Sequence, residues 1–486
     1  MGPRVIRSLV TPLLFVAAAA CGHGAARAPV RGASVAMAVP PVAPTAGWSY
    51  EVVASAHGEV LTVEAVFGAG TGGELSVGEG LESFVRDVVV HEGPRHTSIA
   101  LAGDRWRIPS CATGCRISYV VRLGDAARAH EERSIARTQG DGTAIESPPS
   151  SWLLRPLEAP PGLPFRFHVT SAPGEAFAAG VFPVAGQLDT YEGHTGGGFD
   201  LPYAAFGRIR RKELAQGHVE LALFPGSLRD EPSVIAWVER SARVVESFYG
   251  RFPIPRVLVL LQPSPGSSRV GFGTTMGSSG AAIEVPVGEN VTPDALREDW
   301  MLVHEMVHTA LPDLSRTHHW LEEGLATYIE PLARAHAGLV PPEQVWREWI
   351  VGMPQGQPAR GDQGLDRTRT WGRTYWGGAL FCLAADVEIR ERTNNRRSLT
   401  DAVRAIVAQG GNISVGWPID KVLDVGDAAT GVPVLRETYA RMATAPAPVD
   451  LARLWSRLGV RLERGKLTYD DAAPLASIRR SMTEPR

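Results

Sequence analysis

The segment His304-Glu305-Met306-Val307-His308 holds residue types that bind and use a divalent metal ion. On a helix, residues four positions apart lie on one face, so the imidazoles of His304 and His308 can bind the same tetrahedral cation. Glu305 lies beside both and is placed to take a proton from a metal-bound water. The spacing therefore predicts one Zn²⁺ per chain, with the two histidines as ligands and Glu305 as the general base.

A catalytic zinc needs a third protein ligand and one open position. Glu323, in the segment Trp-Leu-Glu-Glu-Gly-Leu-Ala at 320–326, follows the second histidine by 15 residues, on a predicted helix that can return antiparallel to the first. We expect Glu323 to be this ligand. His318 and His319 precede that helix and are the alternative ligands. Glu322 points about 100° away around the helix, and we expect it to be structural or to support a ligand.

The elements that carry these residues are predicted to be helices. Thr292 is a suitable N-cap and Pro293 a suitable first residue, and apolar residues recur at helical spacing as far as Ala310. We therefore expect one helix over 293–310. Further helices are predicted at 232–249 between strands at 219–224 and 257–261, from about 320 to 336, at about 374–393, and from Ser398, which opens a capping-box-like segment, to Gly410.

The first half of the chain has strand signals instead. Runs of alternating or β-branched residues recur at 59–67, 84–90, 117–123 and 165–169, separated by Gly and Pro. The sequence therefore predicts an α+β multidomain protein. We expect a β-sandwich-like N-terminal domain at 48–212, a mainly helical domain at 213–475 that contains the metal site, and a tail at 476–486.

The N-terminus has the pattern of a secretory signal. Residues 1–21 carry two arginines and then an apolar run that is too short to cross a bilayer. The run ends in Ala-Ala-Ala-Cys-Gly at 18–22, which resembles a bacterial lipoprotein signal with Cys21 as the lipidated residue. Residues 22–47 are rich in Ala and Pro and are predicted to be a tether. These features predict a lipid-anchored protein of the bacterial cell envelope, or a secreted or periplasmic one if Cys21 is not used.

The remaining cysteines and the composition add three expectations. Cys111 and Cys115 lie four residues apart around a glycine, which in an oxidising envelope favours a disulfide over a metal site, whereas Cys382 lies in an apolar run and is expected to be a buried thiol. With 49 Lys and Arg against 52 Asp and Glu, the net charge of −3 provides no basic field for nucleic acid. The chain has 12 Trp, and we expect some of them to line a cleft.

The metal motif and the segment that follows it resemble a known family. His-Glu-x-x-His followed by Trp-Leu-x-Glu-Gly-x-Ala is similar to the gluzincin metallopeptidases, in particular the glycyl-aminopeptidase-like group, and more distantly to the aminopeptidase-N and leukotriene-hydrolase group. The resemblance covers roughly residues 160–475 and implies a thermolysin-like zinc-peptidase domain. The segment 373–380 is similar to the family's Tyr-x-x-Gly segment, which implies that Tyr375 donates a hydrogen bond to the oxyanion.

The sequence departs from the family where substrate is selected. Aminopeptidases carry a Gly-Ala-Met-Glu-Asn strand whose Glu holds the free α-amine; here the glycine-rich segment 271–285 lacks that motif, and it is open whether Glu284 serves instead. Glu330 follows Glu323 by seven residues on nearly the same helix face. It either holds a ligand imidazole or is a solvated carboxylate.

The resemblance and the motif together predict a zinc-dependent metallopeptidase of the bacterial envelope that hydrolyses a peptide or protein substrate. Whether it is an endopeptidase or an aminopeptidase is left open. The alternative is a non-catalytic envelope lipoprotein that uses the peptidase-like fold as a binding or assembly module.

Overall fold

The computed structural model describes residues 47–68, 71, 73–108, 114–196 and 199–484. The predicted signal segment with Cys21, nearly all of the tether, and Cys111 lie outside these residues. Cys115 is disulfide-bonded, and Cys382 is a free, buried thiol as expected. Within the described residues, no helix has the length and apolar character needed to cross a bilayer.

The N-terminal part is built from β-sheets, which agrees with the strand signals of the sequence. The largest is a seven-stranded sheet whose inner strands alternate buried and half-buried residues, as in β1. Its order is β14(Thr190–His194)-β12(Pro164–Thr170)-β1(Trp48–Ala54)-β2(Leu61–Phe67)-β8(Cys115–Val121)-β4(Val85–Glu92)-β5(Arg95–Ser98). Two four-stranded sheets have the orders β13(Ala176–Ala179)-β15(Ala204–Gly207)-β10(Ala144–Glu146)-β9(Arg137–Gln139) and β11(Arg155–Pro156)-β3(Glu74–Ser76)-β7(Arg105–Arg107)-β6(Leu101–Ala102).

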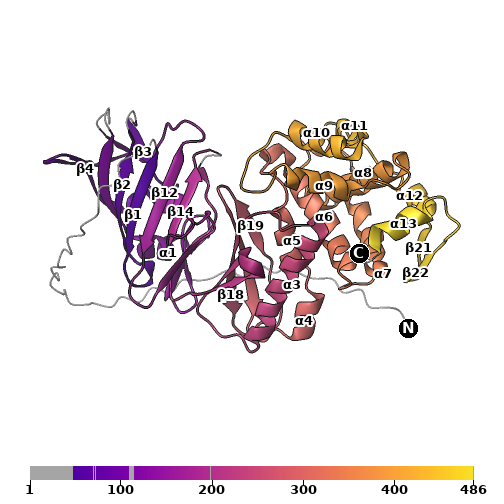
Figure 1. Ribbon diagram of the computed structural model, residues 1–486, viewed down its shortest axis with the longest axis horizontal. Helices are drawn as coiled ribbons and strands as arrows, with labels where there is room; N and C mark the ends of the chain where they lie inside the picture. The colour runs from indigo at the N-terminus through magenta and orange to yellow at the C-terminus, as the bar shows by residue number, and fades with distance from the viewer. Residues whose placement is uncertain (1–46, 69–70, 72, 109–113, 197–198, 485–486) are drawn as a thin grey trace. The chain divides into compact units, whose positions relative to one another are not determined.

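A five-stranded sheet begins the second part of the chain. Its order is β16(Arg210–Leu214)-β17(Val219–Leu223)-β18(Val257–Ser264)-β20(Ala281–Gly288)-β19(Thr274–Gly277). The three inner strands are parallel, and β19 is an antiparallel edge strand beside α5 (Figure 1). Every residue of β17 is buried, because helices cover one face of this sheet and the sheet containing β13 and β15 covers the other.

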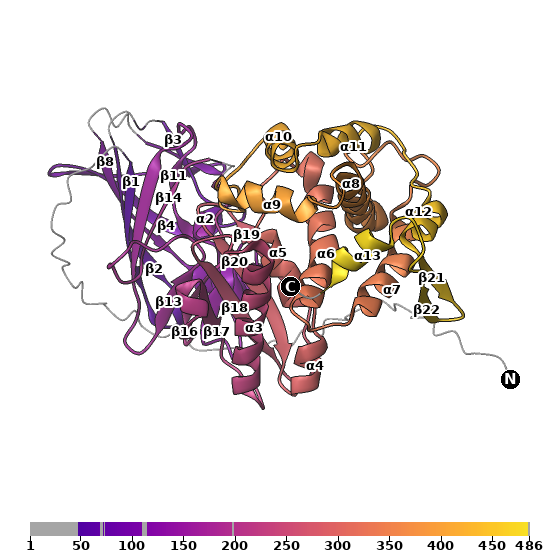
Figure 2. The ribbon, with the colours of Figure 1, turned by 45° about the vertical axis from the view of Figure 1, so that its right-hand side comes forward.

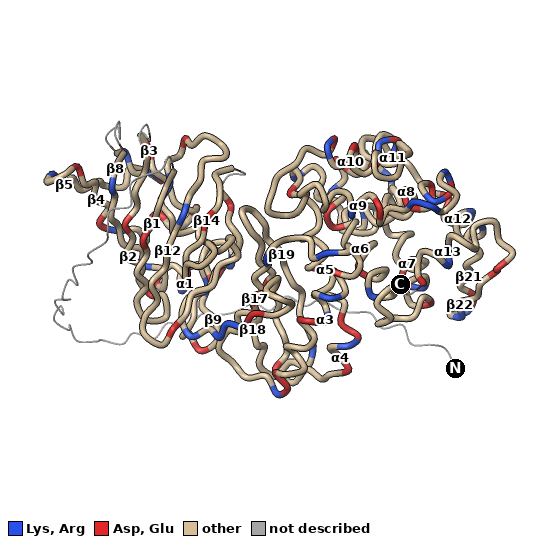
Figure 3. The backbone as a smooth tube through the Cα atoms, in the orientation of Figure 1, with Lys and Arg blue, Asp and Glu red and all other residues tan. Residues whose placement is uncertain are grey.

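Helices make up most of the remaining chain, and Figure 2 shows α6 between α5 and α8. The helices are α3(Glu231–Tyr249), α4(Pro293–Glu298), α5(Met301–His308), α6(His319–His336), α7(Pro342–Gly352), α8(Gly378–Arg392), α9(Leu399–Ala408), α10(Ile419–Thr430), α11(Val434–Met442), α12(Leu451–Leu458) and α13(Ala476–Thr483). The capping box predicted at Ser398 is present, with Asp401 as its partner. Lys and Arg are interspersed with Asp and Glu along the chain (Figure 3), in keeping with the small net charge.

The prediction of one continuous helix over 293–310 was wrong, because the chain breaks at Asp299. This residue has extended backbone angles (φ −60°, ψ 139°), and its carboxylate accepts hydrogen bonds from the backbone N–H of Leu302 at 3.3 Å and from Nε1 of Trp237 at 3.1 Å. Asp299 thus satisfies an N-terminal N–H of α5, which starts a new helix. Trp300, which follows the break, is 42% exposed.

Candidate metal centre

Two helices in contact with each other bring the three predicted ligands together. α5 presents His304 and His308 on one face, with ring centroids 5.0 Å apart, and α6 presents Glu323 toward them. Oε2 of Glu323 lies 3.5 Å from Nε2 of His304 and 3.6 Å from Nε2 of His308. Bonds of about 2.0–2.2 Å to a tetrahedral zinc place neighbouring ligand atoms about 3.4 Å apart, so these spacings fit the ion.

The pKa values of His308 and Glu323 are shifted in the directions that suit metal ligands. Burial lowers the pKa of His308 to about 4, so its imidazole is neutral at physiological pH, as coordination requires. Burial also lowers the pKa of His304, but its hydrogen bond with Glu323 and the nearby carboxylates outweigh this, and its net pKa is raised. Burial alone raises the pKa of Glu323, but the hydrogen bond from His304 and the charges of the histidines outweigh it, and the net pKa is lowered. The carboxylate is therefore ionised, which zinc binding also requires.

Glu305 is held next to the ligands by the edge strand β19. The hydroxyl of Thr275 donates a hydrogen bond to Oε2 of Glu305 at 2.6 Å. Just before that strand, Gly273 packs so closely that a Cβ there would lie 2.6 Å from Cγ of Glu305. Burial raises the pKa of Glu305 above its ordinary value, in the direction expected for a general base.

Tyr375 approaches the centre from a π-helical turn, Arg373–Gly377, that leads into α8. Trp371 stacks on its ring at 5.8 Å. Burial, followed by the negative charges of Glu323 and Glu305, raises the pKa of Tyr375 to about 12, so the phenol keeps its proton and can donate it in a hydrogen bond. The turn is fixed by a close contact of α6 with α8, because a Cβ on Gly324 would overlap the backbone of Gly378.

The alternative ligands are occupied elsewhere. His318 binds Asp366 through Nδ1 at 3.1 Å. His319 is hydrogen-bonded to Glu322 at 3.0 Å, and its Nε2 lies 3.6 Å from the other oxygen of Glu323, outside the ligand group. Glu322 also accepts the backbone N–H of Leu314 at 3.0 Å, so it holds the loop before α6, which is the structural role expected for it.

Glu330 is not a solvated carboxylate, and it acts on the ligand His304 through its charge rather than through a hydrogen bond. It is buried, which rules out a solvated carboxylate, and among the described residues it makes no hydrogen bond to a histidine. Instead it accepts a hydrogen bond from Arg334 at 2.8 Å, and Arg334 also donates to the backbone carbonyl of Glu298 at 2.9 Å. The pair therefore joins α6 to the end of α4.

Glu284 is engaged by arginines of the N-terminal part. Arg137 donates a hydrogen bond to its Oε1 and also pairs with Glu146 at 2.8 Å, while Nη1 of Arg133 lies 3.7 Å from its Oε2. The carboxylate thus links β20 to the loop and strand around β9. Its Oε2 is buried and accepts no hydrogen bond from the described residues, so one oxygen of this carboxylate is engaged and the other is not.

Sequence reasoning missed the contacts of Thr275 and Arg133. No local motif marks either residue, because both act through tertiary contacts. The signal available was the glycine-rich segment before β19, which indicated a close approach of backbone without identifying its partner.

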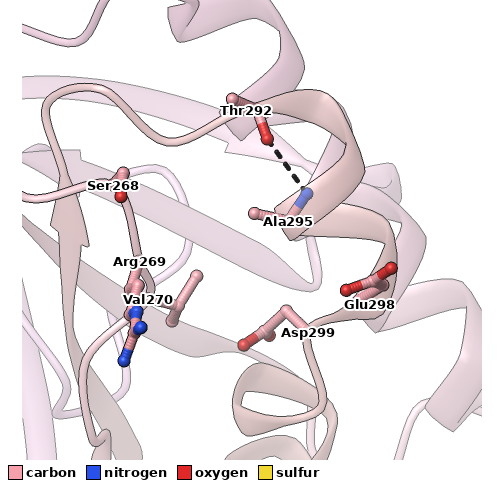
Figure 4. Close-up of a pocket in the computed structure, with 7 residues that line it drawn as sticks. All are labelled: Ser268, Arg269, Val270, Thr292, Ala295, Glu298 and Asp299. Carbon is pink, nitrogen blue, oxygen red and sulfur yellow. Dashed lines mark hydrogen bonds between the residues drawn. The ribbon is translucent and has the colours of Figure 1, made fainter.

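A hollow of about 460 Å³ lies apart from this centre. It is lined by Ser268, Arg269, Val270, Thr292, Ala295, Glu298 and Asp299 (Figure 4). Thr292 caps α4 there by accepting the backbone N–H of Ala295 at 3.2 Å. None of the predicted site residues lines this hollow.

Comparison with known proteins bears on the fold. No protein-family model matches the sequence, and no curated protein sequence matches it. An aminopeptidase N family protein from Idiomarina loihiensis superposes with a TM-score of 0.63 at 15% identity, covering 86% of this chain and 79% of that one. An M1 zinc metallopeptidase from Deinococcus radiodurans gives a TM-score of 0.52 at 15% identity, with 82% and 95% covered. The chain thus has the mixed α+β, multidomain fold of M1 zinc metallopeptidases, as the resemblance implied.

Proposed function

We propose that the protein is a zinc-dependent metallopeptidase that hydrolyses peptide bonds. The observation that supports this most directly is the convergence of His304, His308 and Glu323 on one point with Glu305 beside it. Such a set leaves a coordination position open, which distinguishes a catalytic zinc site from a structural one. Among the solved structures of this fold, one M1 metallopeptidase is bound to a Tyr-Ser-Ala substrate and another to L-tryptophan, which supports a peptide substrate.

The protein side chains divide the chemistry as follows. When bound, Zn²⁺ polarises the scissile carbonyl and lowers the pKa of the attacking water. Oε1 of Glu305 takes the proton of that water and later gives it to the leaving amine, while Thr275 occupies Oε2 and fixes the orientation of the carboxylate. The phenol of Tyr375 donates a hydrogen bond to the carbonyl oxygen as negative charge develops on it.

The proposal includes the setting of the enzyme. Cys21 anchors the chain in the bacterial envelope, the tether extends from it, and a β-sandwich-like domain precedes the thermolysin-like catalytic domain. The disulfide bond of Cys115, for which we propose Cys111 as the partner, is consistent with an oxidising compartment. The engagement of Glu284 with Arg137 favours an endopeptidase over an aminopeptidase.

The test combines metal content with cleavage. Full-length protein purified without chelator should carry about one zinc per chain and cleave members of a peptide library, and His308→Ala should lose most of the zinc. Glu305→Gln should retain zinc and lose nearly all hydrolysis. Zinc binding without cleavage of any peptide would favour the non-catalytic alternative, and absence of zinc from replete wild-type protein would remove the site assignment.

A further inference from the structure

A partly exposed cation lies at the start of the edge strand next to the metal centre. Arg133 sits in a tight turn that is closed by a bridge between Glu132 and Ala136. Its Nη1 donates a hydrogen bond to the hydroxyl of Thr274 at 2.5 Å. Thr274 is the first residue of β19, and the next residue, Thr275, holds Glu305. The guanidinium thus contacts the residue of β19 that directly precedes the one holding the general base.

Arg133 makes no hydrogen bond to the buried carboxylates beside it within the described residues. Arg137 already binds both Glu146 and Glu284, and Arg133 reaches Glu284 only at 3.7 Å. Burial, followed by the charge of the neighbouring Glu284, raises the pKa of Glu146 above its ordinary value. The two arginines and the two glutamates balance in formal charge, and Arg133 belongs to the cluster through charge rather than through a hydrogen bond.

Most of the donors of Arg133 have no partner. A guanidinium carries five N–H groups in a planar fork that fits a carboxylate. Within the described part of the chain Arg133 uses one of them in a hydrogen bond, and its side chain is 43% exposed. It therefore has both the charge and the donors to bind an anionic group from solution.

The strand beside it is suited to receive an extended peptide. β19 ends the sheet order, and no other strand of the described residues pairs with its outer edge. An extended chain can add to such an edge through main-chain hydrogen bonds, and its side chains then meet groups at the edge. A peptide on β19 would pass close to both Glu305 and Arg133.

We propose that Arg133 binds a carboxylate of the peptide substrate and so selects peptides with an acidic group in the segment that lies along β19. This inference rests on the proposed peptidase function and names its substrate class. A free α-ammonium group would meet a like charge at the same place. The carboxylate comes either from an Asp or Glu side chain or from the C-terminus of the peptide.

The experiment measures selectivity on matched substrates. Internally quenched peptides of one length are made in three sets: with Asp or Glu and a C-terminal amide, with Asn or Gln and a C-terminal amide, and with Asn or Gln and a free C-terminal carboxylate. Wild type, Arg133→Gln and Arg133→Lys are compared. The control is Arg116→Gln on β8, whose side chain is 48% exposed and also lies 3.7 Å from a glutamate.

We expect wild type to cleave one of the carboxylate-bearing sets with a kcat/KM about tenfold higher than that of the neutral set. This is the difference expected when one partly exposed hydrogen bond between charged groups is present for one peptide and absent for the other. Arg133→Gln should reduce this ratio to near one, whatever its effect on the cleavage of neutral peptides, Arg133→Lys should keep part of it, and Arg116→Gln should leave it unchanged. Which set is preferred identifies the source of the carboxylate.

Binding provides a second readout that does not depend on hydrolysis. Calorimetry on the Glu305→Gln variant, with and without Arg133→Gln, should show the same preference in Kd for an Asp-containing or C-terminally free peptide over its neutral counterpart. Cleavage without any acidic preference, or a preference that survives Arg133→Gln, would overturn the inference and leave the peptidase proposal intact. A binding preference that depends on Arg133 without cleavage would support the inference and contradict the peptidase.

Discussion

Thr275 donates its hydroxyl hydrogen to one oxygen of Glu305, and this leaves the other oxygen to exchange a proton with substrate and water. A carboxylate that accepts a hydrogen bond on one oxygen has a fixed plane, so its second oxygen is aimed rather than free to rotate. The edge strand that is placed to receive a peptide is therefore also the element that orients the general base.

Replacement of Thr275 by Val should remove this hydrogen bond while keeping the shape of the side chain. The loss of one hydrogen bond to a charged group costs about 1.5 kcal/mol or more, which corresponds to a fall in kcat of at least about tenfold. Zinc content should not change. Thr275→Ser, which retains the hydroxyl, is the control, and equal kcat values for the two variants would show that another group orients Glu305.

Tyr375→Phe keeps the ring that stacks on Trp371 and removes one donor. A donor that acts on the developing oxyanion is worth about 2.7–4 kcal/mol, so kcat should fall by roughly 10²–10³ with KM and zinc content little changed. Steady-state kinetics and metal analysis of the two proteins measure this. A decrease of less than about threefold would assign the role to another group, and loss of fold would make Tyr375 a packing residue.

Glu330 should make stability depend on pH. Its pKa is raised by burial to about 7, whereas an unfolded Glu has a pKa of about 4.3. Between these values the folded chain binds more protons than the unfolded chain, so the free energy of unfolding decreases as pH rises, by about 2–3 kcal/mol from pH 5 to 8. Glu330→Gln keeps an acceptor for Arg334 and should remove this part of the slope in urea unfolding. Parallel pH profiles for the two proteins would contradict the assignment.

Cys21 should determine where the protein is found. Full-length wild type expressed in a bacterium should fractionate with membranes. Cys21→Ser should be released or remain unprocessed, because a protein that lacks the lipidated cysteine has no lipid anchor. The zinc content and peptide cleavage of the two forms should be equal. Identical fractionation would indicate an ordinary secretory signal.

The metal ligands could be predicted from the sequence because the spacing of residues along a helix is a local property. Two histidines four apart and a glutamate on a returning helix require only that both segments be helical, and the structure brings these three groups together. Two tryptophans lie beside site residues: the ring of Trp300 is 5.5 Å from that of His304, and Trp371 stacks on Tyr375. That tryptophans line a cleft stays a prediction.

The rest of the site depends on contacts between distant segments. Thr275 faces Glu305 only because β19 pairs with β20 in one particular register, and neighbouring residues of a strand point to opposite faces. The break before α5 depends on the hydrogen bond of Asp299 with Trp237, 62 residues away. The spacing of apolar residues over 293–310 does not depend on that hydrogen bond. It therefore predicts an unbroken helix.

The contact of Gly324 with Gly378 limits how the parts of the site can move relative to one another. Glu323 precedes one of these glycines and Tyr375 lies three residues before the other, and the two backbones touch without any side chain between them. This contact between α6 and α8 therefore fixes the distance between the carboxylate of Glu323 and the phenol of Tyr375. A movement that admits a substrate must therefore keep α6 and α8 together, and it can only change the distance between these two helices and β19, the strand that carries Thr275.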